Sequence, residues 1–270
     1  MATIIRTEQN STKRFYQETV QPVKLPTAEI KLDASKTYQS MIGFGGAFTE
    51  SSAYNLLRIN TKAREQAIKD YFDKEEGLGY TIGRVSIHGC DFSLNSYTYI
   101  EEGDKELETF DISRDEQAVI PLIKDAEKYA GPIQLVASPW SPPAFMKDNN
   151  SMIYGGKLLP EYMQAWADYF VKFIEEYRRH GLTMWGVTVQ NEPAAVQRWD
   201  SCIYSGEEER DFVKHYLGPT MKNSSAQDVN ILIWDHNRDI MVERATAVLE
   251  DPEAAQYVWG TAFHWYVSEA

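Results

Sequence analysis

Residues 183–193 read TMWGVTVQNEP, and this stretch decides the fold class. An apolar run with the composition of a buried strand ends abruptly at Asn191, Glu192 and Pro193. In an α/β barrel the C-terminal tip of a strand faces the active site, so the stretch predicts a carboxyl group at such a site. The adjacent amide can bind a ring hydroxyl while the acid protonates a glycosidic oxygen. The alternative is a loop carboxylate that only caps the next element.

On either side of this stretch, strand-like and helix-like segments alternate from about residue 40 onward. We expect strands over 42–44, 80–87, 132–138, 184–190, 229–235 and 257–265. We expect helices over 50–58, 62–73, 115–129, 160–180, 206–216 and 239–249. The aromatic stripe of the helix over 160–180 is typical of a core-facing surface. Six strands separated by helices predict a parallel sheet of the α/β class.

The connections favour a barrel over an open doubly wound sheet. Links from helix to strand are short, at 77–79, 130–132 and 180–182. Links from strand to helix are long, at 88–114, 139–159 and 191–205. Long loops at the C-terminal ends of the strands build the site of a barrel enzyme. We therefore predict a (β/α)8 TIM barrel, of which strands one to six are present. The glycines at 43–46 lack the spacing of a dinucleotide-binding loop.

The first 37 residues differ in character from the rest. Segments 15–23 and 28–32 alternate like antiparallel strands and are separated by prolines. We predict that residues 1–37 contribute strands to a small side β-domain, and that residues 38–270 form the barrel domain.

Composition excludes several classes of partner. The formal net charge is −13 over 270 residues, which argues against nucleic acid and anionic membrane surfaces. The two cysteines form neither a disulfide framework nor a metal-type spacing. No apolar run reaches the length of a membrane span, and the start lacks the apolar core of a signal peptide. We expect a cytoplasmic protein, or a secreted one if a leader was removed; the oligomeric state is not predicted.

Polar or aromatic side chains recur where the predicted strands end. In strand order they are Asp91, Trp140, Asn191, Glu192, Asn237, His264 and Tyr266. In a barrel these strand ends meet at one cleft. Singly each has a structural alternative, because Asp91 can cap a helix, Trp140 can fill a core and His264 can be a buried histidine. Together the carboxylates, amides and aromatic rings favour sugar binding. The five histidines show no metal-ligand spacing, so we expect neither a metal nor a cofactor.

Five motifs occur in one order: GFGGAFT at 43–49, CDFS at 90–93, ASPWSPP at 137–143, NEP at 191–193 and HWY at 264–266. This order and spacing resemble glycoside hydrolase family 30, the glucosylceramidase-like retaining β-glycosidases. The similarity runs from about residue 38 to the end. It implies a (β/α)8 barrel fused to a β-sandwich that is made from both chain ends.

The resemblance also implies a role for each matching position. Glu192 matches the general acid/base at the end of the fourth strand. Asn191 matches the amide that binds the 2-hydroxyl of the sugar in the −1 subsite. Asp91 and Trp140 match groups that hold the distant hydroxyls and wall the pocket.

Four further positions match the family at the same cleft. Arg84 matches an arginine that lies beneath the catalytic carboxylates and can keep one of them ionised. Tyr266 matches a tyrosine near the nucleophile, and His264 and Asn237 match other cleft positions. As a general acid, Glu192 is expected to have a raised pKa in the free enzyme.

The family nucleophile is a glutamate at the end of strand seven, which we expect to follow the last residue of this sequence. A retaining mechanism needs two carboxyl groups roughly 5–5.5 Å apart. Glu269 lies three residues past Tyr266, and we interpret it as a loop carboxylate rather than a substitute. We therefore expect the 270 residues to be a fragment of a longer enzyme; a natural non-catalytic form is the alternative.

The implied function is that of a retaining β-glycosidase acting on a β-linked glucoside or oligosaccharide. Within the family, β-1,6-glucanase and β-xylosidase are alternatives. We expect the loops over 141–159 and 193–206 to shape the subsites that distinguish them. A module that binds carbohydrate without cleaving it is the alternative of a different class.

Overall fold

The computed structural model describes residues 4–13, 16–19 and 31–267, and the chain divides into two compact units, 1–42 and 43–270. In the first unit, β1 (Ile4–Arg6) pairs antiparallel with β2 (Tyr16–Glu18). The strand predicted over 15–23 contains β2, whereas β1 was not predicted. The strand predicted over 28–32 lies mostly outside the described residues, and residues 31–32 are not in a strand.

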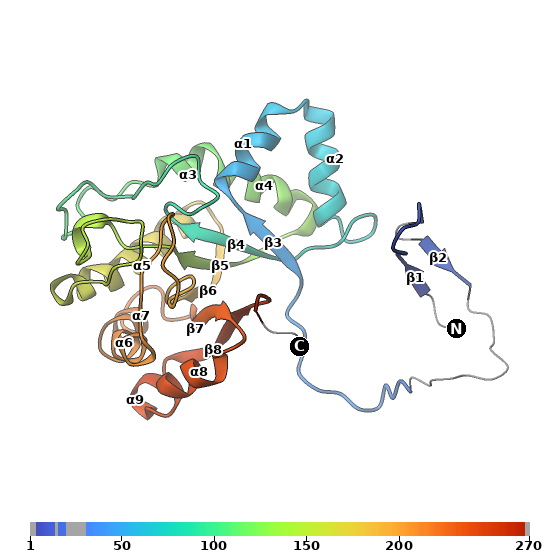
Figure 1. Cartoon of the computed structure of the whole chain (residues 1–270). Coiled ribbons are helices and arrows are strands. Elements are labelled where there is room, and N and C mark those ends of the chain that lie inside the picture. Colours follow the sequence, from blue (N-terminus) through green and yellow to red (C-terminus); the bar gives the residue numbers. More distant parts are fainter. Residues whose placement is uncertain (1–3, 14–15, 20–30, 268–270) are drawn as a thin grey trace. The chain divides into compact units, whose positions relative to one another are not determined.

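The second unit contains a parallel sheet whose strands follow one another in chain order (Figure 1). Its strands are β3 (Gly45–Phe48), β4 (Ile82–Ile87), β5 (Gln134–Pro139), β6 (Thr183–Thr188), β7 (Asn230–Asn237) and β8 (Val258–His264). A doubly wound sheet reverses its strand order at a switch point. The order here has no reversal, as in a (β/α) barrel, and the predicted α/β barrel class is confirmed.

Helices alternate with these strands. They are α1 (Glu50–Arg58), α2 (Thr61–Phe72), α3 (Ser113–Gln117), α4 (Val119–Ala130), α5 (Met163–Arg179), α6 (Gly206–Phe212), α7 (Gly218–Lys222), α8 (Met241–Leu249) and α9 (Pro252–Ala255). Short 3₁₀ turns lie at Ala144–Met146 and Pro160–Tyr162, and a π-helical turn at Val213–Leu217 joins α6 to α7. Among the described residues, no helix is long and apolar enough to cross a membrane.

Most elements lie within a few residues of their predicted bounds, and three differ more clearly. The first strand of the sheet begins at Gly45, not at residue 42, and Gly45 approaches β4 so closely that a Cβ there would clash with the Ile82 carbonyl oxygen. The helix predicted over 115–129 is split at Ala118 into α3 and α4. The helix predicted to end at 216 continues through the π-helical turn to Lys222, although Pro219 lies within it.

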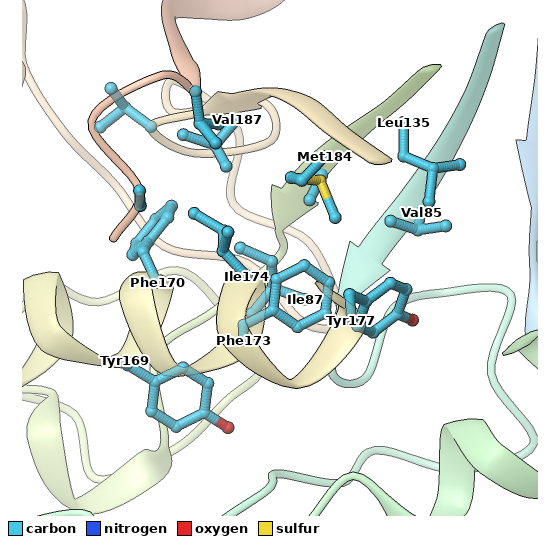
Figure 2. Close-up of a cluster of buried hydrophobic side chains, with 14 of the residues drawn as sticks. Val85, Ile87, Leu135, Tyr169, Phe170, Phe173, Ile174, Tyr177, Met184 and Val187 are labelled. Carbon is cyan, nitrogen blue, oxygen red and sulfur yellow. The ribbon is translucent and has the colours of Figure 1, made fainter. Parts of the chain in front are cut away.

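Part of the core lies between the sheet and α5, and α2, α4, α6 and α8 also contribute buried side chains. In Figure 2, side chains of α5 and of β4, β5 and β6 gather into one cluster, which includes Ile87, Phe170 and Met184. The aromatic side chains within α5 are completely buried, as the sequence predicted, whereas Tyr162 of the predicted stripe lies in the preceding 3₁₀ turn and is half-buried. This packed layer supports β4 to β6, beyond whose C-terminal ends Asp91, Trp140 and Glu192 lie.

Candidate active site

The C-terminal ends of the strands border a cavity of about 430 Å³, within the usual range for small-molecule sites. It is lined by Arg84, Asp91, Phe92, Trp140, Asn191, Glu192, Gln197, Trp199, His236, Asn237, His264 and Tyr266. All eight residues that the sequence singled out therefore line one cavity.

Glu192 lies four residues past the end of β6, in a turn, and its side chain lines this cavity. Its backbone is left-handed, with φ of 50°, which is uncommon outside glycine. Two backbone hydrogen bonds fix the turn: the Asn191 N–H donates to the Pro139 carbonyl (2.8 Å), and the Glu192 N–H donates to the Asp235 carbonyl (3.0 Å). Backbone strain of this kind persists where the surroundings enforce it, and it is common at functional sites.

Strand β7 carries a β-bulge beside Glu192. The register with β8 shifts between Trp234 and His236, and both Trp234 and Asp235 have positive φ (74° and 52°). A bulge adds one residue to a strand and redirects the side chains that follow. The consecutive residues His236 and Asn237 both line the cavity, where a regular strand would turn one of them away.

A buried glutamate of α6 supports this bulge. Glu209 is fully buried, and its Oε1 accepts a hydrogen bond from the Trp234 N–H (2.8 Å). Its Oε2 lies 3.6 Å from the Arg244 guanidinium, which also donates to the Tyr204 carbonyl. Burial raises the pKa of Glu209 to about 6.

Asp235 is the centre of a charged network beneath the cavity. Its Oδ2 accepts hydrogen bonds from Arg84 and from the Thr188 hydroxyl, both at 2.7 Å, and its Oδ1 lies 3.1 Å from His264 Nε2. Burial opposes ionisation of Asp235, but Arg84 and His264 hold its pKa well below the usual range. Arg84 thus helps to keep Asp235 ionised, whereas the sequence predicted this effect for one of the catalytic carboxylates.

His264 joins this network to Glu192. Its Nδ1 lies 3.0 Å from Glu192 Oε1, so the imidazole bridges two carboxylates. Burial alone lowers the pKa of His264, but the hydrogen bonds to Asp235 and Glu192 outweigh burial and raise it to about 9. At neutral pH His264 is therefore a cation that donates from both ring nitrogens.

The contact with His264 lowers the pKa of Glu192, and burial opposes this effect only in part. The pKa of Glu192 is therefore lowered, whereas the sequence predicted a raised pKa for a general acid. The physical reason is that a cation holds the carboxylate. The nearby Asp91 carboxylate is the only other acidic side chain among the described residues that line the cavity.

The amide of Asn191 has a fixed orientation. Its Oδ1 accepts a hydrogen bond from Arg84 (2.9 Å), so its Nδ2 is left to donate to a ligand. Arg84 also lies over the Trp140 ring, with its guanidinium carbon 4.7 Å from the ring centroid. Burial raises the pKa of Asp91, and the Trp140 indole partly offsets this as a hydrogen-bond partner. These contacts gather Asn191, Trp140 and Asp91 on one part of the cavity wall.

Four lining residues were not predicted as site residues: Phe92, Gln197, Trp199 and His236. Phe92 directly follows the predicted site residue Asp91, and His236 directly follows the strand predicted over 229–235. Their positions next to predicted strand ends could therefore have identified them. Gln197 and Trp199 lie in the long loop after β6, and the conformation of such a loop cannot be predicted from the sequence alone.

Glu269 lies outside the described residues. No group of three or more potential metal ligands occurs in the part of the chain that the structure describes.

The chain is similar to known glycosidases over most of its length. Residues 41–270 match the glycosyl hydrolase family 30 TIM-barrel domain. Putative glucosylceramidase 3 of Caenorhabditis elegans is 42% identical over 247 residues, which are 88% of this chain and 47% of that protein. Lysosomal acid glucosylceramidase of Mus musculus is 39% identical, with 88% and 48% covered.

A solved endo-β1,6-glucanase superimposes with a TM-score of 0.86 at 32% identity, and the match covers 96% of this chain and 58% of that one. The chain spans about half the length of the curated relatives it matches. Since the family domain matches far more than half of the residues, the chain belongs to glycoside hydrolase family 30.

Proposed function

We propose that the protein is a retaining β-glucosidase in which Glu192 is the general acid/base. The observation that carries the proposal is the position of Glu192: just past the C-terminal end of β6, in a left-handed turn, with its carboxylate held by His264 and lining the cavity beside Asn191. In this role Glu192 protonates the glycosidic oxygen and later deprotonates the attacking water. The names of the glucosylceramidase relatives support a β-glucoside as substrate.

The nucleophile in this proposal is a glutamate in the part of the family fold that the 270 residues do not cover. Its negative charge raises the pKa of a neighbouring acid, and that effect disappears when the nucleophile is glycosylated. The lowered pKa of Glu192 beside His264 then describes the second step, in which Glu192 must be ionised to act as a base. His264 thus favours the basic form, and the nucleophile's charge favours the acidic form.

In the other proposed roles, Asn191 donates from Nδ2 to the 2-hydroxyl of the sugar in the −1 subsite, while Asp91 and Trp140 hold the distant hydroxyls. Arg84 positions Asn191 and Asp235, Asn237 contributes to the wall of the cleft, and Tyr266 lies near the nucleophile. Glucosylceramide is one candidate substrate, because of the names of the glucosylceramidase relatives. A β-1,6-glucan is the second, because of the structural match to an endo-β1,6-glucanase. Ceramide release from the lipid and oligosaccharide release from the glucan measure these two activities directly.

The test of the proposal is Glu192→Gln in the protein at its natural length. We expect turnover of alkyl glucosides, whose leaving groups need protonation, to fall by about 10²–10⁴-fold. The first step with a 2,4-dinitrophenyl glucoside should be nearly unchanged, because that leaving group departs without a proton. Glu161→Gln, at an exposed carboxylate, is the matched control. Equal losses on both substrates would rule out the acid/base role.

A further inference from the structure

Gln197, Trp199 and His236 line the cavity but make no hydrogen bond with Asp235 or His264 within the described residues. Gln197 and Trp199 come from the loop after β6, and His236 follows the bulge of β7. Within the described residues, no hydrogen bond joins them to Asp91, Trp140 or Arg84. They form a second group of lining side chains, which we call the loop-side group.

The loop-side group borders Glu192 directly. Gln197 is a hydrogen-bonding neighbour of Glu192, and His236 interacts with it electrostatically. A general acid must reach the oxygen between the cleaved sugar and its leaving group. Since Asp91, Trp140 and Asn191 are proposed to hold the cleaved sugar, the other group beside Glu192 lies where the leaving group is bound.

The chemistry of the lining suits a ring with hydroxyls. Among the described residues that line the cavity, none is aliphatic, and every apolar one is aromatic. An acyl or sphingoid chain is matched by aliphatic walls, whereas an indole face stacks on the C–H surface of a sugar. The amide of Gln197 can both donate and accept hydrogen bonds.

His236 supplies the strongest requirement for a polar ligand. The residue is only 9% exposed, and its buried Nδ1 has no hydrogen-bond partner within the described part of the chain. A buried polar group without a partner is costly, so a ligand hydroxyl that pairs with it is favoured. Burial lowers the pKa of His236, which leaves the ring neutral and able to donate or accept.

The loop that carries Gln197 and Trp199 is held in place before any ligand binds. The Tyr154 N–H donates to the Gln197 carbonyl (2.7 Å), and the Ser201 N–H donates to the Met152 carbonyl (2.9 Å). Lys147, only 2% exposed, donates to the Ser201 carbonyl (2.7 Å) and to the Ser141 hydroxyl (3.0 Å). A loop fixed in this way binds a ligand without an ordering cost.

We propose that Gln197, Trp199 and His236 form a leaving-group subsite that binds a second sugar ring in preference to a lipid chain. The proposal rests on the β-glucosidase function above and specifies its aglycone. Trp199 stacks on the ring, and Gln197 and His236 bind its hydroxyls. The cleaved bond is then one between two sugars.

The test compares three substrates in the protein at its natural length: gentiobiose, β-glucosyl fluoride and glucosylceramide in detergent micelles. Gentiobiose carries a sugar leaving group, the fluoride carries none, and the ceramide carries a lipid. We expect Trp199→Ala, Gln197→Ala and His236→Ala each to lower kcat/KM for gentiobiose about tenfold or more. The value for β-glucosyl fluoride should change less than about threefold, because no leaving-group contact is lost. Trp199→Phe should restore part of the activity on gentiobiose, since it keeps a ring.

The matched control is Val196→Ala, in the same loop, at a side chain that is 60% exposed and does not line the cavity. Equal losses on gentiobiose and the fluoride would overturn the proposal, because the residues would then serve the cleaved sugar or the fold. A higher kcat/KM for glucosylceramide than for gentiobiose would also overturn it. No turnover of any of the three substrates, together with no labelling by a 2-deoxy-2-fluoro-glucoside, would instead refute the β-glucosidase function itself. If Trp199→Ala does not fold, Trp199→Phe and Gln197→Ala decide the result.

Discussion

At the scale of single residues, His264 sets the charge of the site. It lies between Glu192 and Asp235, at 3.0 and 3.1 Å, and has a pKa of about 9. A histidine in water has a pKa near 6.5, so folding stabilises the protonated form. The same contact that favours the basic form of Glu192 therefore links the stability of the fold to pH.

The sign of this linkage is definite. Because the folded pKa of His264 is higher than the unfolded one, its contribution is complete below about pH 6.5 and is lost as pH rises through about 9. We expect the free energy of unfolding to decrease over this range by up to about 3 kcal/mol. Urea unfolding at pH 6, 7.5 and 9 measures it, and His264→Asn should remove this part of the decrease. The same pH dependence in both proteins would contradict the prediction.

At the scale of elements, the bulge of β7 depends on α6. Glu209 accepts a hydrogen bond from the Trp234 N–H and faces Arg244, all in a buried environment. Glu209→Ala removes the acceptor of a buried N–H and the only carboxylate that faces the Arg244 guanidinium among the described ion pairs, so we expect a loss of about 3 kcal/mol in stability. Hydrolysis of β-glucosyl fluoride should fall as well, because Asp235 follows Trp234 in the bulge.

Glu209→Gln is the matched control for this prediction, since the amide oxygen can still accept from Trp234. Glu209→Gln should lose less than half as much stability as Glu209→Ala, and it should keep most of the activity. Urea unfolding and initial rates on both variants measure the two effects. Equal losses of stability and activity in Glu209→Gln and Glu209→Ala would show that the hydrogen bond from the Trp234 N–H does not support the bulge.

The same elements show how far sequence reasoning reaches. Strand and helix positions followed from apolar periodicity, and the alignment of strand ends predicted that Asp91, Asn191 and Glu192 share a cleft. The bulge at Asp235 could not be predicted, because an extra residue in a strand leaves no mark in the pattern of apolar positions. The split of the predicted helix at Ala118 was missed as well: α3 carries Asp115, which is buried and accepts hydrogen bonds from the Tyr99 and Tyr177 hydroxyls. Both features involve partners that are distant in sequence.

At the scale of the whole molecule, the sheet of the second unit has two outer strands, β3 and β8, within the described residues. Outer strands present unpaired backbone groups, and exposed apolar side chains on them favour association. On β8, Trp259 and Phe263 are 55% and 57% exposed. The formal net charge of −13 makes two chains repel each other at long range, but the apolar side chains on β8 remain exposed at short range.

We therefore expect the 270 residues, expressed on their own, to self-associate through the β8 edge. The average mass by light scattering should rise with protein concentration above the 31.0 kDa of one chain. Phe263→Lys should reduce this association, because a lysine on an outer strand opposes pairing with another chain. Val242→Lys makes the same charge change on α8, at a side chain that is 73% exposed, and should have little effect. A constant mass of one chain at every concentration, or an equal response to both lysines, would show that the exposed β8 edge does not drive association.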